Sequence, residues 1–154
     1  MNLKVVSGGQ SGVDRAALDV ALESGAGAGG WCPKGRLAED GRIPDRYPLK
    51  ETLTADYAER TELNVRDSDA TLILHRGPLV GGTALTLQLA GQWKRPALCV
   101  DLGESTQLDG QRVRDWLTDH RVGILNVAGP RESGSPGIYR AARQFLIEVF
   151  QKFA

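Results

Sequence analysis

Cysteine and histidine are both scarce in this sequence, with two residues of each among its 154. Cys32 and Cys99 are far apart and form no CxxC pair, which argues against a disulfide framework and indicates a reduced, cytoplasmic protein with free thiols. His75 and His120 have no metal-ligand spacing. The sequence therefore predicts no metal site built from protein side chains.

Long apolar runs and an excess of one charge are also missing. No stretch approaches the roughly 18 apolar residues that a membrane helix needs, and the apolar run in MNLKVVSGG is too short for a signal peptide. Nineteen basic residues balance nineteen acidic ones, which argues against a broad nucleic-acid surface. We therefore expect no membrane and no nucleic-acid partner, although a local anion site needs only a few donors.

What the sequence does contain is an alternation of short apolar runs with helical patterns. Strands are expected at 3–7, 26–31, 70–74, 97–101 and 122–127, and helices at 13–24, 55–67, 83–93, 111–119 and 137–153. Apolar strands that alternate with helices predict a parallel sheet covered on both faces. The expected fold is one α/β domain over residues 1–154, with a doubly wound, mainly parallel sheet and helices on both faces.

Residues 32–54 interrupt this alternation, because they show no clear period. A loop of this length inside a compact domain is usually functional or mobile. It contains Lys34 and Arg36 in the stretch WCPKGR. Either the segment is a solvated loop of mixed charge, or it is a lid that supplies Lys34 and Arg36 to an anionic ligand.

Glycine-rich loops follow three of the expected strands: SGGQSG at 7–12, HRGPLVGG at 75–82 and AGPRESGSPG at 128–137. The carboxyl ends of parallel strands share one sheet edge, where ligands bind, so we expect the loops to face one crevice. Gly8, Gly9 and Gly12 let the chain turn tightly and bring N–H groups near an anion. A plain strand–helix turn is the alternative reading of these three glycines.

The first glycine loop does not match the common nucleotide motifs. In the dinucleotide pattern G-x-G-x-x-G the first glycine is replaced by Ser7, and residues 25–38 contain no acid that would bind a ribose. No G-K-[ST] follows, so the loop is not a P-loop either. NAD and ATP in their usual binding modes are therefore disfavoured.

Several cations and hydroxyls lie close to these loops. Arg15 is in the first turn of a helix, where it either contacts an anion or is solvated. Arg76 follows a strand at the ligand edge, and Thr83 begins a helix as a ligand or as an ordinary N-cap. Arg131 is expected to contact an anion, with pairing to Glu132 as the alternative.

The stretches SGGQSGVDRAALD, GGWCPKGRLAEDG, RTELNVRDSDATLIL, GPLVGGTALT and NVAGPRESGSPGIY follow one another through nearly the whole chain. Together they resemble the molybdenum carrier family, which is Rossmann-like and similar to lysine-decarboxylase-like proteins and cytokinin-activating phosphoribohydrolases. The resemblance implies a homo-oligomer whose cargo is molybdenum cofactor, a phosphorylated pterin that holds molybdate through a dithiolene. It also implies that residues 8–12 form one anion-binding loop and residues 81–83 a second.

The related hydrolases carry a P-G-G-x-G-T-x-x-E motif, and the matching stretch here is PLVGGTALT. Leu79 and Val80 replace two glycines, and Thr86 stands where the hydrolases have their acid–base glutamate. A threonine does not hold or release a proton near neutral pH. This departure favours binding over hydrolysis.

The leading hypothesis is a carrier that binds molybdenum cofactor, or a related phosphorylated heteroaromatic ligand, and passes it to a molybdoenzyme. One alternative is a hydrolase that cleaves the N-glycosidic bond of a nucleotide, with Asp14, Glu39 or Asp40 in place of the missing glutamate. Another is a nucleotide-sensing module. The expected ligand contacts are Gly8, Gly9, Gln10, Ser11, Gly12, Arg15, Lys34, Arg36, Arg76, Gly81, Gly82, Thr83, Arg131 and Ser133.

Overall fold

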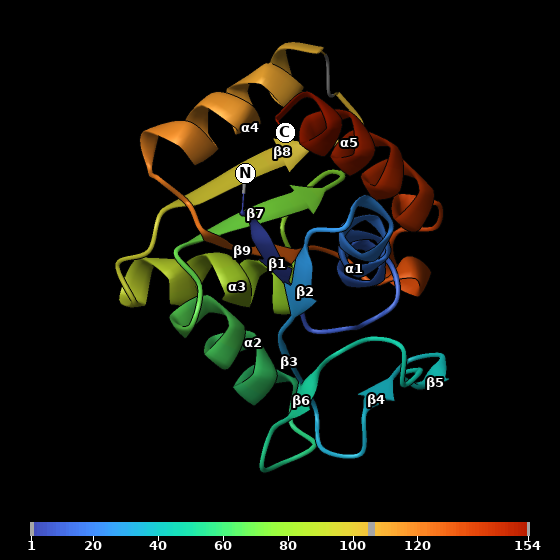
Figure 1. Cartoon of the computed structure of the whole chain (residues 1–154). Coiled ribbons are helices and arrows are strands. Elements are labelled where there is room, and N and C mark those ends of the chain that lie inside the picture. Colours follow the sequence, from blue (N-terminus) through green and yellow to red (C-terminus); the bar gives the residue numbers. More distant parts are fainter. Residues whose placement is uncertain (1, 105–106, 154) are drawn as a thin grey trace.

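The computed structural model describes residues 2–104 and 107–153 and has a five-stranded parallel sheet at its centre (Figure 1). The strand order is β2-β1-β9-β7-β8, with every neighbouring pair parallel. The strands are β1 (Lys4–Val6), β2 (Gly27–Gly29), β7 (Ala70–His75), β8 (Ala97–Asp101) and β9 (Ile124–Ala128). The α/β prediction with a parallel sheet is confirmed.

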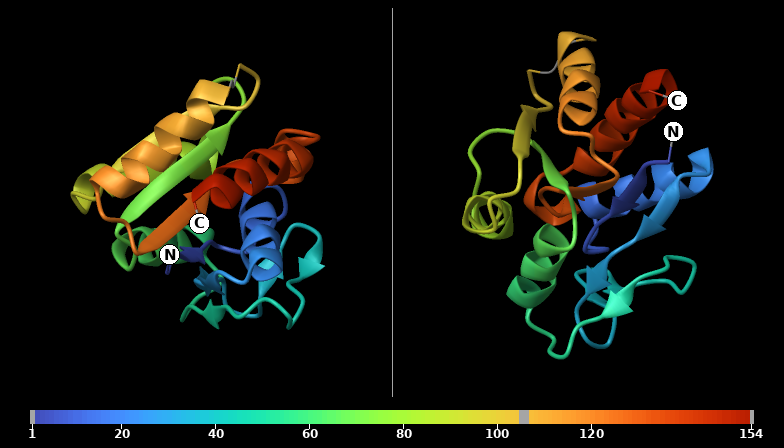
Figure 2. Two further views of the ribbon diagram at one scale, coloured as in Figure 1. Left: turned by 45° about the horizontal axis from the view of Figure 1, so that its top comes forward. Right: turned by 60° about the vertical axis from the view of Figure 1, so that its left-hand side comes forward.

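Helices cover both faces of the sheet (Figure 2). One face carries α1 (Val13–Ser24), α4 (Gln107–Asp119) and α5 (Ile138–Phe153), and the other carries α2 (Tyr57–Arg66) and α3 (Gly81–Gln92). The bounds of α1 and β8 agree with the sequence expectation. None of the helices in the described part of the chain is both long and apolar enough to cross a membrane.

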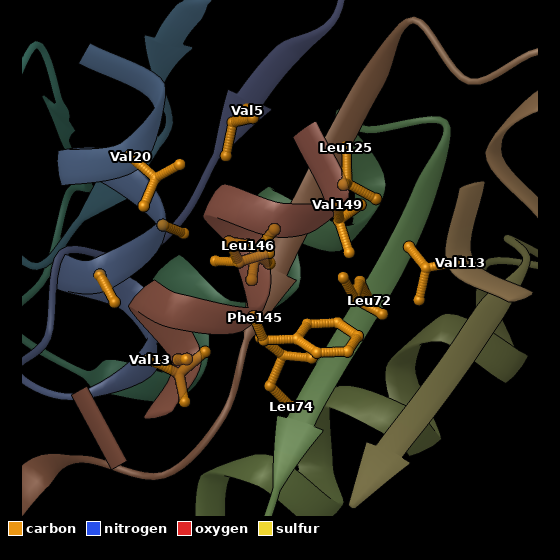
Figure 3. Close-up of a cluster of buried hydrophobic side chains, with 14 of the residues drawn as sticks. Val5, Val13, Val20, Leu72, Leu74, Val113, Leu125, Phe145, Leu146 and Val149 are labelled. Carbon is orange, nitrogen blue, oxygen red and sulfur yellow. The ribbon is translucent and has the colours of Figure 1, made fainter. Parts of the chain in front are cut away.

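The main core lies between the sheet and the helices α1, α4 and α5 (Figure 3). Alternate residues of a strand point to opposite faces, so Leu125 and Val127 of β9 enter this core. Asn126, between them, faces α2 and α3 and is 2% exposed. The same alternation that builds the core therefore places a polar side chain beneath the other helix layer.

The region around residues 26–54 differs from the sequence expectation. The single strand expected at 26–31 is broken at Gly30, whose φ is +127° and whose Cβ position would lie 2.3 Å from the Ser7 carbonyl oxygen. The remainder, β3 (Trp31–Cys32), pairs with β6 (Lys50–Glu51), and β4 (Leu37–Ala38) pairs with β5 (Gly41–Arg42). Residues 32–54 thus form an ordered segment outside the central sheet, and its short strands pair in two small sheets.

Several further boundaries differ from the sequence prediction. Helix α4 begins at Gln107, four residues before the expected start, and α2 is shorter than expected at both ends. Helix α3 begins at Gly81, two residues before the expected start, so both glycines belong to its first turn. Strand β9 begins at Ile124, two residues after the expected start, and Asp69 Oδ2 accepts the N–H groups of Gly123 and Ile124 at this point. A short 3-10 helix at Glu132–Gly134 precedes α5.

Candidate functional site

A cavity of about 450 Å³ opens at the carboxyl edge of the sheet, between α2 and α3. All three glycine-rich loops contribute to it, as the sequence predicts. The lining includes Gly8 and Gln10 from the first loop, residues 75–83 from the second with Gly77 and Leu79 excepted, and residues 128–135 from the third with Glu132 and Ser133 excepted. The volume lies within the range of small-molecule sites.

The N-terminus of α3 lines this cavity with residues 80–83. Its N-cap residue, Val80, makes no side-chain capping bond. The first-turn N–H groups of a helix have no partner within the helix, so those of Gly81 and Gly82 are available to a ligand. A Cβ atom on either glycine would meet nothing within 4 Å. This end of α3 therefore suits an anion.

Charge is distributed unevenly around the cavity. Among the described residues that line it, the cations are Arg60, Arg76 and Arg131, and the single acid is Asp14. Arg76 also donates to the Pro136 carbonyl oxygen at 3.3 Å, which holds the second loop against the third. The excess of arginines favours a negatively charged ligand.

The first glycine loop uses its N–H groups within the chain. The N–H of Gly9 donates to Ser7 Oγ at 3.4 Å, that of Gln10 to Asp14 Oδ2 at 3.4 Å, and that of Ser11 to Gln10 Oε1 at 3.0 Å. What this loop presents to the cavity is therefore the Asp14 carboxylate. The two glycine loops, which look alike in the sequence, have opposite electrical character.

Asp14 and Arg60 form a buried pair beside the first glycine loop. Arg60 Nη1 lies 3.9 Å from Asp14 Oδ2 and donates to the Gly8 carbonyl oxygen at 3.0 Å. Burial raises the pKa of Asp14 to about 6, although the nearby Arg60 acts to lower it. A Cβ atom at Gly8 would lie 2.6 Å from Arg60 Nη1, so a side chain there would displace the guanidinium from its present position.

Sequence reasoning missed Arg60, because it belongs to no motif. Its one sequence signal is helical spacing, since it follows Tyr57 by three residues and precedes Asn64 by four on the cavity side of α2. The Asn64 side chain accepts the Trp31 N–H and donates to the Trp31 carbonyl oxygen, which ties α2 to β3. The α2 wall of the site depends on these two side chains.

The structure divides the sequence-predicted ligand residues into two groups. Those that line the cavity are Gly8, Gln10, Arg76, Gly81, Gly82, Thr83 and Arg131. Those that do not are Gly9, Ser11, Gly12, Arg15, Lys34, Arg36 and Ser133. Most of the second group lies on the far side of the first loop or in the segment 32–54. Ser133 lies in the 3-10 helix of the third loop, where its N–H donates to Glu39 Oε2.

Arg15 and Gly9 face away from the cavity. Arg15 forms an ion pair with Asp40 at 3.1 Å and lines a shallower hollow on the other side of the first loop. At Gly9 a Cβ atom would lie 2.6 Å from Leu49 Cδ1 and 2.9 Å from Ile43 Cδ1. A side chain at position 9 would therefore disturb the packing of the segment 32–54 rather than fill the cavity.

Arg36 stabilises its own segment and does not reach the cavity as a lid residue would. Its guanidinium is buried and donates to the carbonyl oxygens of Ile43, Pro44 and Tyr47 at 3.0, 2.7 and 2.9 Å. Those bonds hold the segment 32–54 in shape and use the donors that a ligand would need. Lys34 is exposed and also lies outside the cavity.

The candidate acids of a hydrolase are mostly engaged elsewhere. Glu39 accepts hydrogen bonds from Ser11 Oγ and the Ser133 N–H, which lower the pKa of its carboxyl group. Asp40 pairs with Arg15. Thr86 does line the cavity, but its hydroxyl donates to the Gly82 carbonyl oxygen at 2.8 Å.

Replacing Asp14 by asparagine should raise stability at neutral pH. The pKa of Asp14 is near 3.8 in an unfolded chain and about 6 when folded, so between these values folding binds a proton. Stability contributed by this group is therefore full below pH 4 and is lost as the pH rises to 6, by about 3 kcal/mol. Urea unfolding should show Asp14→Asn more stable than the wild type at pH 7 and equal to it at pH 4. An equal difference at both pH values would contradict the assignment.

Comparisons with known proteins give two matches. The model of the circularly permutated YpsA SLOG family matches residues 5–150. A crystal structure from Syntrophus aciditrophicus SB, named as a "putative molybdenum carrier protein", superposes with a TM-score of 0.92 at 46% sequence identity. This match covers 99% of the present chain and 94% of the other. No curated protein matches.

Proposed function

The chain belongs to the circularly permutated YpsA SLOG family, and from this premise we propose that it binds and carries a phosphorylated heteroaromatic ligand. The observation that carries the proposal is the uncapped N-terminus of α3, which opens into a 450 Å³ cavity lined by three arginines. The name of the solved relative supports molybdenum cofactor as the cargo. A carrier of this kind would pass its cargo to a molybdoenzyme.

We propose that the phosphate binds at the start of α3. The N–H groups of Gly81 and Gly82 and the helix dipole would stabilise its charge, and Arg76 and Arg131 would flank it. The half-exposed Tyr57 at the start of α2 offers an aromatic face for the ring of the ligand. Further along α2, Thr61 and Asn64 add polar groups to the lining.

Carrying is favoured over hydrolysis by the position of the acids. The cavity holds a threonine, Thr86, where the related hydrolases have a glutamate, and its single described acid is Asp14. A binding protein needs donors for the ligand and no acid–base group at the reacting bond. The donors are present, so binding without turnover is the activity we infer.

Incubation with nucleoside monophosphates should give no steady release of free base. The expected result, read by chromatography at micromolar protein over hours, is recovery of intact nucleotide, because no described carboxylate lies where the hydrolase glutamate would be. Release that disappears in Asp14→Asn would overturn the carrier reading and assign the protein to the phosphoribohydrolases.

Removing Arg131 should weaken ligand binding. A charged hydrogen bond contributes about 1.5–3 kcal/mol, and Arg131 is half exposed, so Arg131→Ala should fall near the lower end of that range. The matched control is Arg15→Ala, which removes an arginine outside the cavity. Calorimetric titration with AMP should show the loss in the first variant only. Equal affinities for the two variants would contradict the proposed phosphate position.

The homo-oligomer implied by the resemblance stays a prediction. Leu87 of α3 and Trp93, the residue that ends it, are about 40% exposed, and a second copy is one way to cover them. On the C-terminal helix, Phe150 packs partly against the core, and the side chain of Phe153 lies outside the described residues. Light scattering at micromolar concentration tests the oligomer directly.

A further inference from the structure

The two ends of the cavity differ in the chemistry that they offer a ligand. The α3 end has free N–H donors and arginines, which suits the phosphate of the proposed ligand. The other end lies at the start of α1, which follows β1, and β9 separates that strand from β7. There the Asp14 carboxylate, 6% exposed, faces Arg60 and is the single acid among the described lining residues. A carboxylate accepts hydrogen bonds and donates none, so a ligand group that reaches Asp14 must donate hydrogen bonds to it.

From this arrangement we infer that Asp14 selects ligands whose ring carries a 2-amino-4-oxo edge, the edge shared by pterins and guanine. The inference rests on the proposed function, since it assumes that the phosphate occupies the start of α3. It adds what the rest of the ligand must be.

The edge in question presents a ring N–H beside an exocyclic amino group, two donors that point the same way. A carboxylate accepts both at once in a charge-assisted, two-point interaction. Adenine presents one amino group beside an unprotonated ring nitrogen, whose lone pair would face the carboxylate. A buried acceptor left without its donors is costly, so a site built this way discriminates strongly.

The groups around Asp14 keep its carboxylate in place for this contact. Arg60 from α2 faces it at 3.9 Å, and the Gln10 N–H donates to the same oxygen, Oδ2. Ser7 Oγ donates to the backbone carbonyl oxygen of Asp14 at 2.8 Å, which fixes the start of α1. Arg15, the other nearby cation, lies on the far side of the loop and pairs with Asp40.

The test compares GMP, IMP and AMP, which share a ribose phosphate and differ at the ring edge. IMP keeps the ring N–H of GMP and lacks the amino group. Calorimetry at pH 7.5 should give affinities in the order GMP, IMP, AMP, with GMP at least about tenfold tighter than AMP. Asp14→Asn should remove this preference by weakening GMP, with AMP changed by no more than about twofold. The control Asp40→Asn should leave all three affinities unchanged.

A second test of the role of Asp14 needs only the wild-type protein. Burial raises the pKa of Asp14 to about 6, so the carboxylate that accepts the donors is lost as the pH falls through that value. The ratio of GMP to AMP affinity should therefore decline between pH 7.5 and pH 5. The phosphates of the two nucleotides titrate alike, so their ionisation cancels in the ratio.

The outcomes separate this inference from the proposed function. Equal binding of GMP and AMP, at both pH values and in both proteins, would overturn the role of Asp14 and leave a phosphate-binding carrier. Binding of none of the three nucleotides at millimolar concentration would overturn the inference together with the proposed function. A preference for GMP that persists in Asp14→Asn would place the selective contact elsewhere.

Discussion

Replacing Gly82 by aspartate should abolish binding of the phosphorylated ligand and leave the fold intact. Gly82 is exposed, a Cβ atom there meets nothing within 4 Å, and its φ is not in the left-handed region. An aspartate in the first turn of α3 interacts favourably with the helix dipole, so the free energy of unfolding should stay equal or rise by about 0.5–1 kcal/mol. The same carboxylate would occupy the place proposed for the phosphate.

The expected loss of affinity is large, because two effects add. The new carboxylate displaces the phosphate from the N–H groups, whose hydrogen bonds to a charged group contribute about 1.5–3 kcal/mol each, and it brings two negative charges together. Binding of AMP should fall at least about 100-fold by calorimetry. The control is Gly91→Asp, which places the same charge on an exposed glycine in the last turn of α3. Unchanged affinity in Gly82→Asp would rule out the start of α3 as the phosphate site.

Replacing Gly12 by alanine should destabilise the protein by about 3–5 kcal/mol. Gly12 has φ +83° and ψ −132°. Residues other than glycine rarely adopt this backbone conformation, which costs them about 1–3 kcal/mol. A Cβ atom there would also lie 2.4 Å from the Pro130 carbonyl oxygen and 2.8 Å from the Glu132 nitrogen. Overpacking of this kind adds about 1–3 kcal/mol, because backbone atoms must shift.

The matched control for this variant is Gly25→Ala. Gly25 has a similar φ of +78° at the end of α1, but a Cβ atom there meets nothing within 4 Å. Its cost should therefore be the conformational term alone, about 1–2 kcal/mol. Urea denaturation of the two variants separates strain from crowding. Equal destabilisation would mean that the third loop yields to the new methyl group.

The layer structure was predictable because it depends on periodicity. Apolar runs such as ALCVD at 97–101 and the helical pattern at 13–24 each specify their own element, and their alternation specifies a parallel sheet. The shared edge of the glycine loops follows from that sheet. The break at Gly30 was not predictable, since it depends on the Ser7 carbonyl oxygen, which approaches from a distant part of the chain.

The site was predictable only in part, because a motif does not say which partner its atoms take. SGGQSG and PLVGG look equally suited to an anion in the sequence. In the structure the Gln10 N–H of SGGQSG donates to the Asp14 carboxylate. The helix that begins after PLV has no side-chain cap. Arg36 illustrates the same limit, since its donors are taken by carbonyl oxygens of its own segment.

The central claim is that a phosphate binds where α3 begins, and amide NMR during a titration with AMP tests it residue by residue. The account predicts that the largest shifts fall on the N–H groups of residues 81–83, with smaller ones at Arg76 and Arg131. Gly91, at the other end of the same helix, should not shift. Shifts concentrated instead on Ser11, Gly12 and Arg15, which line the hollow behind the first loop, would contradict the account.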